Sequence, residues 1–327
     1  MGLVVIVVVA LAFDYTNGFH DAANAIATSV STKAMTPRVA LAMAAVMNVI
    51  GALVSTKVAK TIGQGIVAKP QGDSGLVLVF SALIGAIAWN LLTWYFSLPS
   101  SSSHALIGGL VGATLAASET VKWHGILQKV VVPMVLSPLI GIAVGYVFML
   151  AVLWIFRRAN VGAANRNFRY AQIASGAAMA YGHGTQDAQK TMGVIALALL
   201  ISGHINHFYV PLWVVLAAAL AISAGTYAGG YRIMRTLGRR VIQLTPAGGF
   251  SAQTVASSVM LVTAYGYAVP VSTTHVITSS IMGVGATRRF SAVRWGVAGN
   301  IAVAWVLTLP AAGLAAALIY TIAHAIV

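Results

Sequence analysis

The sequence predicts an all-α polytopic membrane protein, because its composition and its long uncharged segments both favour this fold class. Hydrophobic residues make up 59% of the chain and charged residues only 7%, too few to cover the surface of a soluble protein. A helix needs roughly 20 apolar residues to cross a hydrocarbon core about 30 Å thick, and it satisfies its own backbone groups in lipid. From the number of such segments we expect about 10–12 membrane segments.

The chain carries a formal net charge of +14, which in a soluble protein would suggest a nucleic-acid partner. Its Lys and Arg residues lie between apolar segments, as is typical of cytoplasmic loops and headgroup anchors. We therefore expect a multi-pass protein of the cell membrane, with the lipid bilayer as a partner and no nucleic acid. The chain has no cysteine, and its acidic residues are Asp14, Asp21, Asp73, Glu119 and Asp187.

Apolar segments alternate with polar or basic ones along the whole chain. In order, the apolar segments are 1–13, 39–55, 74–118 (broken at Pro99), 130–156, 170–186, 191–231 (turned at 204–211), 241–287 (broken at Pro270) and 295–327. A polar segment follows the first of these, from Asp14 to Lys33. The densest basic link runs from Arg157 to Arg169, so we place it in the cytoplasm.

Landmarks of the first half of the chain recur in the second half in the same order and at nearly constant spacing. The pairs are Asp21 and Asp187, Lys60 to Gly63 and Arg235 to Gly238, His104 and His275, Gly112 and Gly283, Trp123 and Trp295, and Pro138 and Pro310. We predict a first repeat over 1–156, a basic cytoplasmic linker over 157–169 and a second repeat over 170–327. Such repeats are common in secondary transporters and many are inverted in the membrane, so we expect an inverted repeat.

Each half also contains a run of hydroxyl residues that follows a proline and ends in histidine. Proline removes a backbone donor, and Ser and Thr are good N-caps, so each run predicts a helix break followed by a new helix start. Such a start presents unpaired N–H groups and the positive end of a helix dipole. Two starts that face each other would bind a tetrahedral oxyanion, although Ser and Thr also join helices without any ligand. The predicted substrate-binding hydroxyls are Ser101, Ser102, Ser103, Ser272, Thr273 and Thr274.

Asp21 and Asp187 are the acids whose apolar surroundings repeat in the two halves. Carboxylates inside a membrane are costly and usually serve ion or proton pathways. For Asp187 an ion pair with Lys190, one helical turn away, is the alternative. Two carboxylates beside an anion repel it unless protons, sodium ions or a divalent metal arrive with it. The sequence therefore predicts that anion entry is coupled to cation entry.

Four histidines adjoin these motifs: His20, His104, His183 and His275. Imidazole titrates near neutral pH, so any of them could carry protons. A histidine packed on polar neighbours in a helix is as often structural. We leave both interpretations open.

At these residues the chain resembles the inorganic phosphate transporter (PiT) family. The doubled Gly-Ala-Asn-Asp signature of that family is similar to Gly18 to Asp21 and to Gly184 to Asp187, and its Pro-Val-Ser-Thr-Thr-His motif matches Pro270 to His275. The resemblance covers nearly the whole chain. It implies an inverted-repeat fold with two re-entrant helical hairpins that meet at a midplane phosphate site, in a homodimer. It also implies that Asp21, Asp187 and the hydroxyl residues bind phosphate and the coupling ions.

The chain departs from the sodium-coupled members of that family at three positions. His20 and Gln186 stand where those members carry Asn before each Asp, and Lys190 stands where they carry Asn after the second. A lysine ammonium there could replace a cation, which puts a full set of sodium sites in doubt. The motifs look more like the bacterial low-affinity members that run on protons and often move a metal–phosphate complex. The expected coupling-ion residues are Asp21, Asn24, His20, Asp187, Gln186 and Lys190, and no metal ligand is certain, with Asp21, Asn24 and Asp187 as the cation-ligand candidates.

We therefore predict a secondary active symporter, not an enzyme, that imports inorganic phosphate by alternating access. The coupling ion is a proton or sodium, with protons preferred, and no cofactor is expected beyond it. The substrate is free phosphate or a metal–phosphate complex. The alternatives are a sulfate or other oxyanion permease of the same fold, or an uncoupled anion channel. Phosphate can donate a hydrogen bond to Asp at neutral pH and sulfate cannot, and a channel would not need paired acids.

Overall fold

The protein is a helical bundle, and the computed structural model describes residues 2–67 and 72–326. Within these residues no β-strand forms, and an isolated bridge joins Val67 to Val121. The elements are α1 (Leu3–Ser31), α2 (Pro37–Val54), α3 (Lys57–Gly65), α4 (Gly72–Tyr95), α5 (Ser102–Ala116), α6 (Trp123–Ile126), η1 (Leu127–Val131), α7 (Val132–Ile155), α8 (Val161–His183), η2 (Gly184–Ala188), α9 (Gln189–Ile201), α10 (Leu212–Ala228), α11 (Tyr231–Arg235), η3 (Thr236–Arg240), α12 (Pro246–Leu261), η4 (Val262–Tyr267), α13 (Thr273–Ala286), η5 (Phe290–Ala292) and α14 (Trp295–Ile326).

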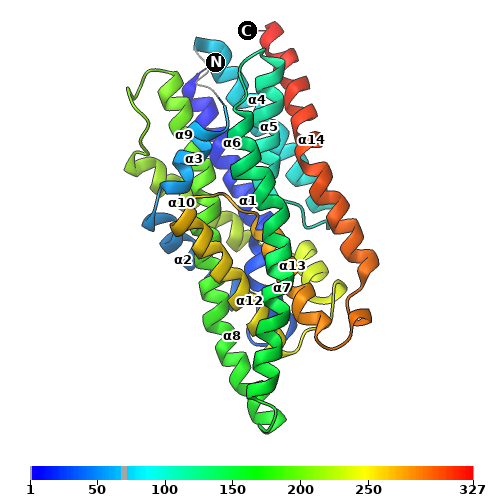
Figure 1. Ribbon diagram of the computed structural model, residues 1–327. Coiled ribbons are helices and arrows are strands. Elements are labelled where there is room, and N and C mark those ends of the chain that lie inside the picture. The colour runs from blue at the N-terminus through cyan, green and yellow to red at the C-terminus, as the bar shows by residue number, and fades with distance from the viewer. Residues whose placement is uncertain (1, 68–71, 327) are drawn as a thin grey trace.

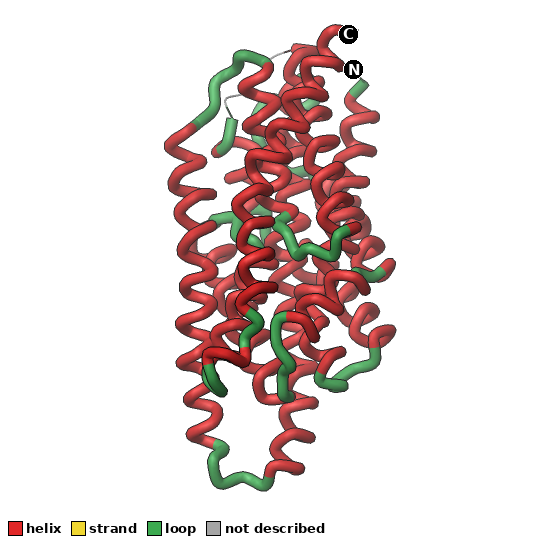
Figure 2. Tube along the Cα trace, turned by 90° about the vertical axis from the view of Figure 1, so that its right-hand side faces the viewer, coloured by secondary structure: helices red, strands yellow, loops and turns green. Residues whose placement is uncertain are grey.

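The bundle is elongated, and the all-α fold class predicted from the sequence is confirmed. Figure 1 shows both ends of the chain at its upper end and the link between α7 and α8 at its lower end. Figure 2 shows loop segments at mid-height within the bundle as well as at its ends, as expected of helices that break inside a membrane. Large apolar side chains on the long outer helices, such as Leu139 and Leu314, are exposed and suit contact with lipid.

Five helical segments of residues 2–67 and 72–326 are long and apolar enough to cross a membrane, and a sixth is added if α10 and the bent segment after it form one span. The five are Leu3–Ser31, Pro37–Val54, Ser74–Tyr95, Trp123–Ile155 and Trp295–Ile326. The other predicted segments fall on shorter or more polar helices. The total of about 10–12 segments therefore stays a prediction.

The polar segment that follows the apolar start of the chain is not a loop, because α1 continues through it to Ser31. Most of its polar side chains are buried against other helices. Asp14, Asn17, Asp21 and Asn24 follow one another at spacings of three or four residues. This spacing places them on one face of α1.

A second long helical stretch contains Asp187. It runs from Val161 to Ile201 through α8, η2 and α9, and the π-helix η2 interrupts it at Gly184–Ala188, around Asp187. Single π turns within α-helices are frequent at functional sites. Because α8 begins at Val161, most of the predicted basic linker is helical, and the loop itself covers residues 156–160.

The order of elements in residues 3–155 recurs in residues 161–326: a long helix, a second helix, a short helix, a third helix, a break, a half-length helix and a long helix with a proline inside it. The halves are interleaved. The half-length helix α5 packs against α14, and its counterpart α13 packs against α7. The long helix α1 packs against α10, while α8 packs against α2. The inverted relation of the halves stays a prediction.

Glycines permit this close cross-packing of the two halves. A Cβ on Gly112 of α5 would lie 2.0 Å from the carbonyl oxygen of Gly313 in α14. At the matched position, a Cβ on Gly283 of α13 would lie 2.1 Å from the carbonyl oxygen of Ile142 in α7. Small residues let membrane helices approach closely enough for their backbones to touch.

We expect Gly112→Leu to reduce the yield of folded protein strongly, since the obstructing atom is backbone and cannot rotate away. Overpacking alone destabilises by about 1–3 kcal/mol, and here two helices must also separate. The measurement is the monodisperse fraction in detergent by size-exclusion chromatography. Gly299→Leu in α14 is the control, because a Cβ on Gly299 meets nothing within 4 Å. Equal yields for the two variants would show that the close approach is not needed.

Candidate functional site

Two short breaks bring the hydroxyl runs into the interior of the bundle. Helix α5 begins at Ser102, and the Ser101 hydroxyl caps it by accepting a hydrogen bond from His104 N at 3.2 Å. Helix α13 begins at Thr273, and the Ser272 hydroxyl accepts from His275 N at the same distance. Both runs are buried. The helix starts predicted from the prolines and hydroxyls therefore form, with Ser101 and Ser272 as the capping residues.

Asp21 of α1 is bound by hydroxyls from both halves of the chain. Ser102 Oγ donates to Asp21 Oδ2 at 2.7 Å, and Thr274 Oγ1 donates to Asp21 Oδ1 at 3.3 Å. His20 Nδ1 lies 2.7 Å from Asp21 Oδ1. The other ring nitrogen of His20 faces Thr93 Oγ1 at 3.2 Å and Ser100 Oγ at 3.3 Å. A chain of polar contacts thus leads from Asp21 to the break between α4 and α5.

Asp187 of η2 is bound by a hydroxyl, an imidazole and the ammonium of Lys190. Thr273 Oγ1 donates to Asp187 Oδ2 at 3.2 Å, and His183 Nε2 lies 3.0 Å from the same oxygen. The ammonium of Lys190 contacts Asp187 Oδ1 and the hydroxyl of Ser103, and donates to the carbonyl oxygen of Val271 at 3.3 Å. All of these groups are buried. Asp187 therefore has the permanently charged ammonium of Lys190 as its partner, whereas the basic group on Asp21 is the imidazole of His20.

Asn24 joins the two acidic groups. Its amide donates to Thr274 Oγ1 at 2.8 Å and to Thr273 Oγ1 at 3.2 Å, and these two hydroxyls donate in turn to Asp21 and Asp187. The cage, as we call it, consists of Asp21, Asn24, Ser102, Ser103, Asp187, Lys190, Thr273 and Thr274. It places residues from distant parts of the sequence within hydrogen-bond reach of one another.

Gln186 lies outside the cage. Its amide nitrogen donates to the carbonyl oxygens of Met260 and Val269 and to Thr263 Oγ1, and its oxygen accepts from Val271 N at 3.4 Å. These contacts hold the chain that leads into the break before α13. Gln186 was predicted as a coupling-ion residue, but its contacts in this structure are those of a residue that supports the backbone.

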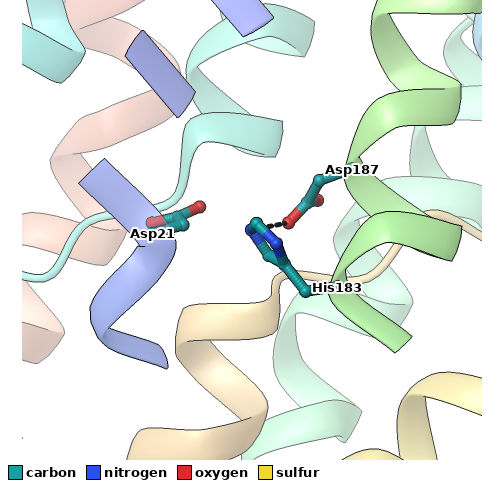
Figure 3. A group of neighbouring side chains, drawn as sticks. All are labelled: Asp21, His183 and Asp187. Carbon is teal, nitrogen blue, oxygen red and sulfur yellow. Dashed lines mark ion pairs between the residues drawn. The ribbon is translucent and has the colours of Figure 1, made fainter. Parts of the chain in front are cut away.

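The space between the two acids has the chemistry of a cation site. One ligand atom each from Asp21, His183 and Asp187 lies within 4.8 Å of the others, and all three residues are buried. Figure 3 shows the His183 ring reaching from the α8 side toward Asp187, with Asp21 opposite on α1. Two carboxylates and an imidazole could hold a proton or a metal cation at this place.

Two polar groups near the cage did not stand out in the sequence. Asn48 of α2 orients His183, since its Oδ1 lies 3.1 Å from His183 Nδ1. The available signal for Asn48 was its position as a polar residue within the apolar segment 39–55. Asp14 is also fully buried, on the face of α1 that carries Asp21. Its position directly after the apolar segment 1–13, in a chain with only five acidic residues, was the signal that could have found it.

The sequence matches the phosphate transporter family over residues 17–316. Relatives named "probable low-affinity inorganic phosphate transporter" include those of Rhizobium meliloti (49% identical, covering 97% of this chain and 95% of the relative), Bacillus subtilis (44%, covering 99% and 97%) and Mycobacterium bovis (48%, covering 98% and 78%). A solved structure named "The sodium-dependent phosphate transporter" has a TM-score of 0.89 and 24% identity and covers 99% of both chains. This last likeness concerns the fold alone.

These matches confirm the resemblance inferred from the doubled motifs. The family match spans both hydroxyl runs and both acidic residues. The named relatives are transporters rather than enzymes, and the helical fold is shared over nearly the full chain. The chain therefore belongs to the phosphate transporter family.

Proposed function

We propose that this chain is a symporter that imports inorganic phosphate across the cell membrane by alternating access. The observation that carries the proposal is the cage, in which hydroxyls at two helix starts converge on two buried acids. Helix starts and hydroxyls are donors that suit a tetrahedral oxyanion. The relatives named as low-affinity inorganic phosphate transporters make phosphate the leading candidate.

The cage itself supplies a reason for coupling. Ser102 and Thr274 donate to Asp21, and Thr273 donates to Asp187, so an entering phosphate competes with both carboxylates for the same donors. An ionised Asp21 beside phosphate would also repel it in a poorly screened site. Phosphate and positive charge therefore favour each other's binding, which is the mutual dependence that symport requires.

We propose that the proton is the coupling ion and that Asp21 is the acid that takes up mobile positive charge. Asp187 already has the ammonium of Lys190, whereas the matched position in the first half is the neutral Asn24. One acid then remains to be neutralised in each cycle. The group of Asp21, His183 and Asp187 offers a place for that charge. A divalent cation bound there with phosphate would make the substrate a metal–phosphate complex.

The arrangement in the membrane follows from the distribution of positive charge. Arg157 and Arg158 lie in the α7–α8 link, at the end of the bundle opposite the two chain ends (Figure 1). Because cytoplasmic links are rich in Lys and Arg, we propose that this end faces the cytoplasm. We also propose that residues 1–156 and 170–327 are inverted repeats around residues 157–169, and that two copies of the chain form a homodimer.

The test is uptake of radiolabelled phosphate into proteoliposomes under an imposed proton gradient or an imposed sodium gradient. We expect a proton gradient, acidic outside, to drive accumulation, and a sodium gradient to have no effect at constant pH. Excess unlabelled sulfate should not compete, because it cannot donate a hydrogen bond to Asp21. Accumulation driven by sodium alone would reject proton coupling. Equal competition by sulfate would replace phosphate with a broader oxyanion substrate, and phosphate current without either gradient would indicate a channel.

A further inference from the structure

A third buried acid lies outside the cage. Asp14 is 0% exposed, and neither of its carboxyl oxygens has a hydrogen-bond partner. It lies seven residues, or about two helical turns, before Asp21 on the same face of α1. Asn17, between them on that face, is also fully buried with both side-chain polar atoms unpartnered. The face of α1 that leads to the cage is therefore polar and unsatisfied.

The charged groups near Asp14 belong to the cage. Its carboxyl group lies beside the hydroxyl of Thr191 in α9, and the charges of Asp187 and Lys190 act on it. The hydroxyl of Thr191 is likewise buried without a partner. Helices α4 and α10 also pack on α1, and their residues 74–95 and 212–228 contain no Asp, Glu, Lys, Arg or His. Asp187 and Lys190 are already bound to each other, so Asp14 has no counter-ion of its own.

A fully buried carboxylate that has no counter-ion, and only the hydroxyl of Thr191 beside it, is far costlier than the neutral acid. A metal cation would need several oxygen ligands around it, whereas a proton needs only the carboxyl group itself. The proximity of the Lys190 ammonium further disfavours a second metal cation. In this conformation the proton is the ligand that the surroundings of Asp14 fit.

A cavity of about 520 Å³ opens at the end where the chain ends lie, lined by Leu3, Val7, Leu199, His204, Tyr209 and Trp213. Val7 lies two turns before Asp14 on α1, and Leu199 lies about two turns after Thr191 on α9. Because the two helices pack together, the cavity and the pair of Asp14 and Thr191 lie along one helix–helix seam.

We propose that Asp14 is a proton-binding residue of the transport cycle, loaded from the end of the bundle that carries the 520 Å³ cavity and separate from the phosphate cage. The inference rests on the proposed function, since it assigns a step to proton-coupled uptake. A proton held at Asp14 is within electrostatic reach of the Asp187–Lys190 pair and lies about two turns from Asp21 along the same face of α1. Its arrival and release therefore change the charge balance of the cage without any contact with phosphate.

The test separates proton coupling from phosphate handling. In proteoliposomes, Asp14→Asn is expected to lower accumulation driven by a proton gradient at least about tenfold, the range of a typical coupling free energy. Exchange of labelled for unlabelled phosphate across the membrane needs no net proton movement and should stay within about twofold of wild type. Asp14→Glu should restore part of the accumulation. Glu119→Gln, at an exposed acid in the loop after α5, is the matched control and should change neither.

A second readout does not depend on transport. The infrared spectrum of the wild-type protein should contain the C=O stretching band of a protonated carboxyl group at neutral pH, and Asp14→Asn should lack that band. Three results overturn the proposal: unchanged accumulation in Asp14→Asn, loss of exchange together with accumulation, or no difference in the band. If the wild-type protein takes up no phosphate under any gradient, the proposed function fails, while the infrared band still decides whether Asp14 holds a proton.

Discussion

Asp21→Asn is expected to abolish the uptake of phosphate against a gradient while the protein still folds and inserts. The substitution keeps the size of the side chain, and the new amide oxygen can still accept from Ser102, so the cage retains its shape. It removes the group that, in our proposal, takes up mobile positive charge. Loss of a coupling free energy of about 1–3 kcal/mol corresponds to a change of about 5–150-fold. We therefore expect accumulation to fall by roughly two orders of magnitude.

The measurement is proton-driven accumulation in proteoliposomes with matched protein content. Exchange of labelled for unlabelled phosphate should not fall, because the neutral amide neither repels phosphate nor competes as strongly for the Ser102 and Thr274 hydroxyls. Glu119→Gln serves as the control for removal of an acid away from the membrane interior. Wild-type accumulation in Asp21→Asn would remove this residue from the coupling mechanism.

Lys190→Asn is expected to have the second large effect, because it leaves Asp187 buried without its positive partner. Removing one member of a buried ion pair destabilises a protein by about 3–5 kcal/mol. We expect a lower unfolding temperature in detergent, and we expect sodium ions to raise that temperature in the variant alone. The reason is that asparagine is the residue at the matched position of the first half, and a mobile cation can then occupy the vacated volume.

Thermal unfolding of the detergent-solubilised protein, with sodium or choline chloride at equal ionic strength, measures this effect. Arg158→Asn removes an exposed positive charge from the α7–α8 link and should change neither the unfolding temperature nor its response to sodium. An unfolding temperature of Lys190→Asn that equals that of wild type would mean that Asp187 does not need the ammonium. Stabilisation of the wild-type protein by sodium would argue that Lys190 does not replace a cation.

The sequence was sufficient to predict the helical class, the doubled landmarks and the two helix starts. These features depend on local chemistry, since a proline followed by hydroxyls breaks and then caps a helix whatever surrounds it. The binding of Asp21 by hydroxyls of both halves, and of Asp187 by Thr273 and Lys190, could be expected only in outline. It depends on how α1, η2, α5 and α13 come together, which no local pattern contains.

Other features could not be predicted from the sequence, because they depend on which side chains the packing of distant helices buries. The polar segment from Asp14 to Lys33 differs in composition from the apolar segment before it, yet α1 continues unbroken to Ser31, since neighbouring helices rather than water surround its polar face. Gln186 directly precedes Asp187, and its side chain nevertheless hydrogen-bonds to the backbone of Val269 and Val271. The places of Asp14 beside Thr191 and of Asn48 beside His183 depend on the packing of distant helices, so the sequence could not predict them.

The interleaving of the two halves has a consequence for co-translational folding. Helix α5, which carries Ser102 and Ser103, packs most extensively against α14, which begins only at Trp295. During synthesis, α5 is therefore made well before the surface on which it packs in the folded protein. We expect the two halves, expressed as separate polypeptides, to be degraded singly and to rescue each other when produced together.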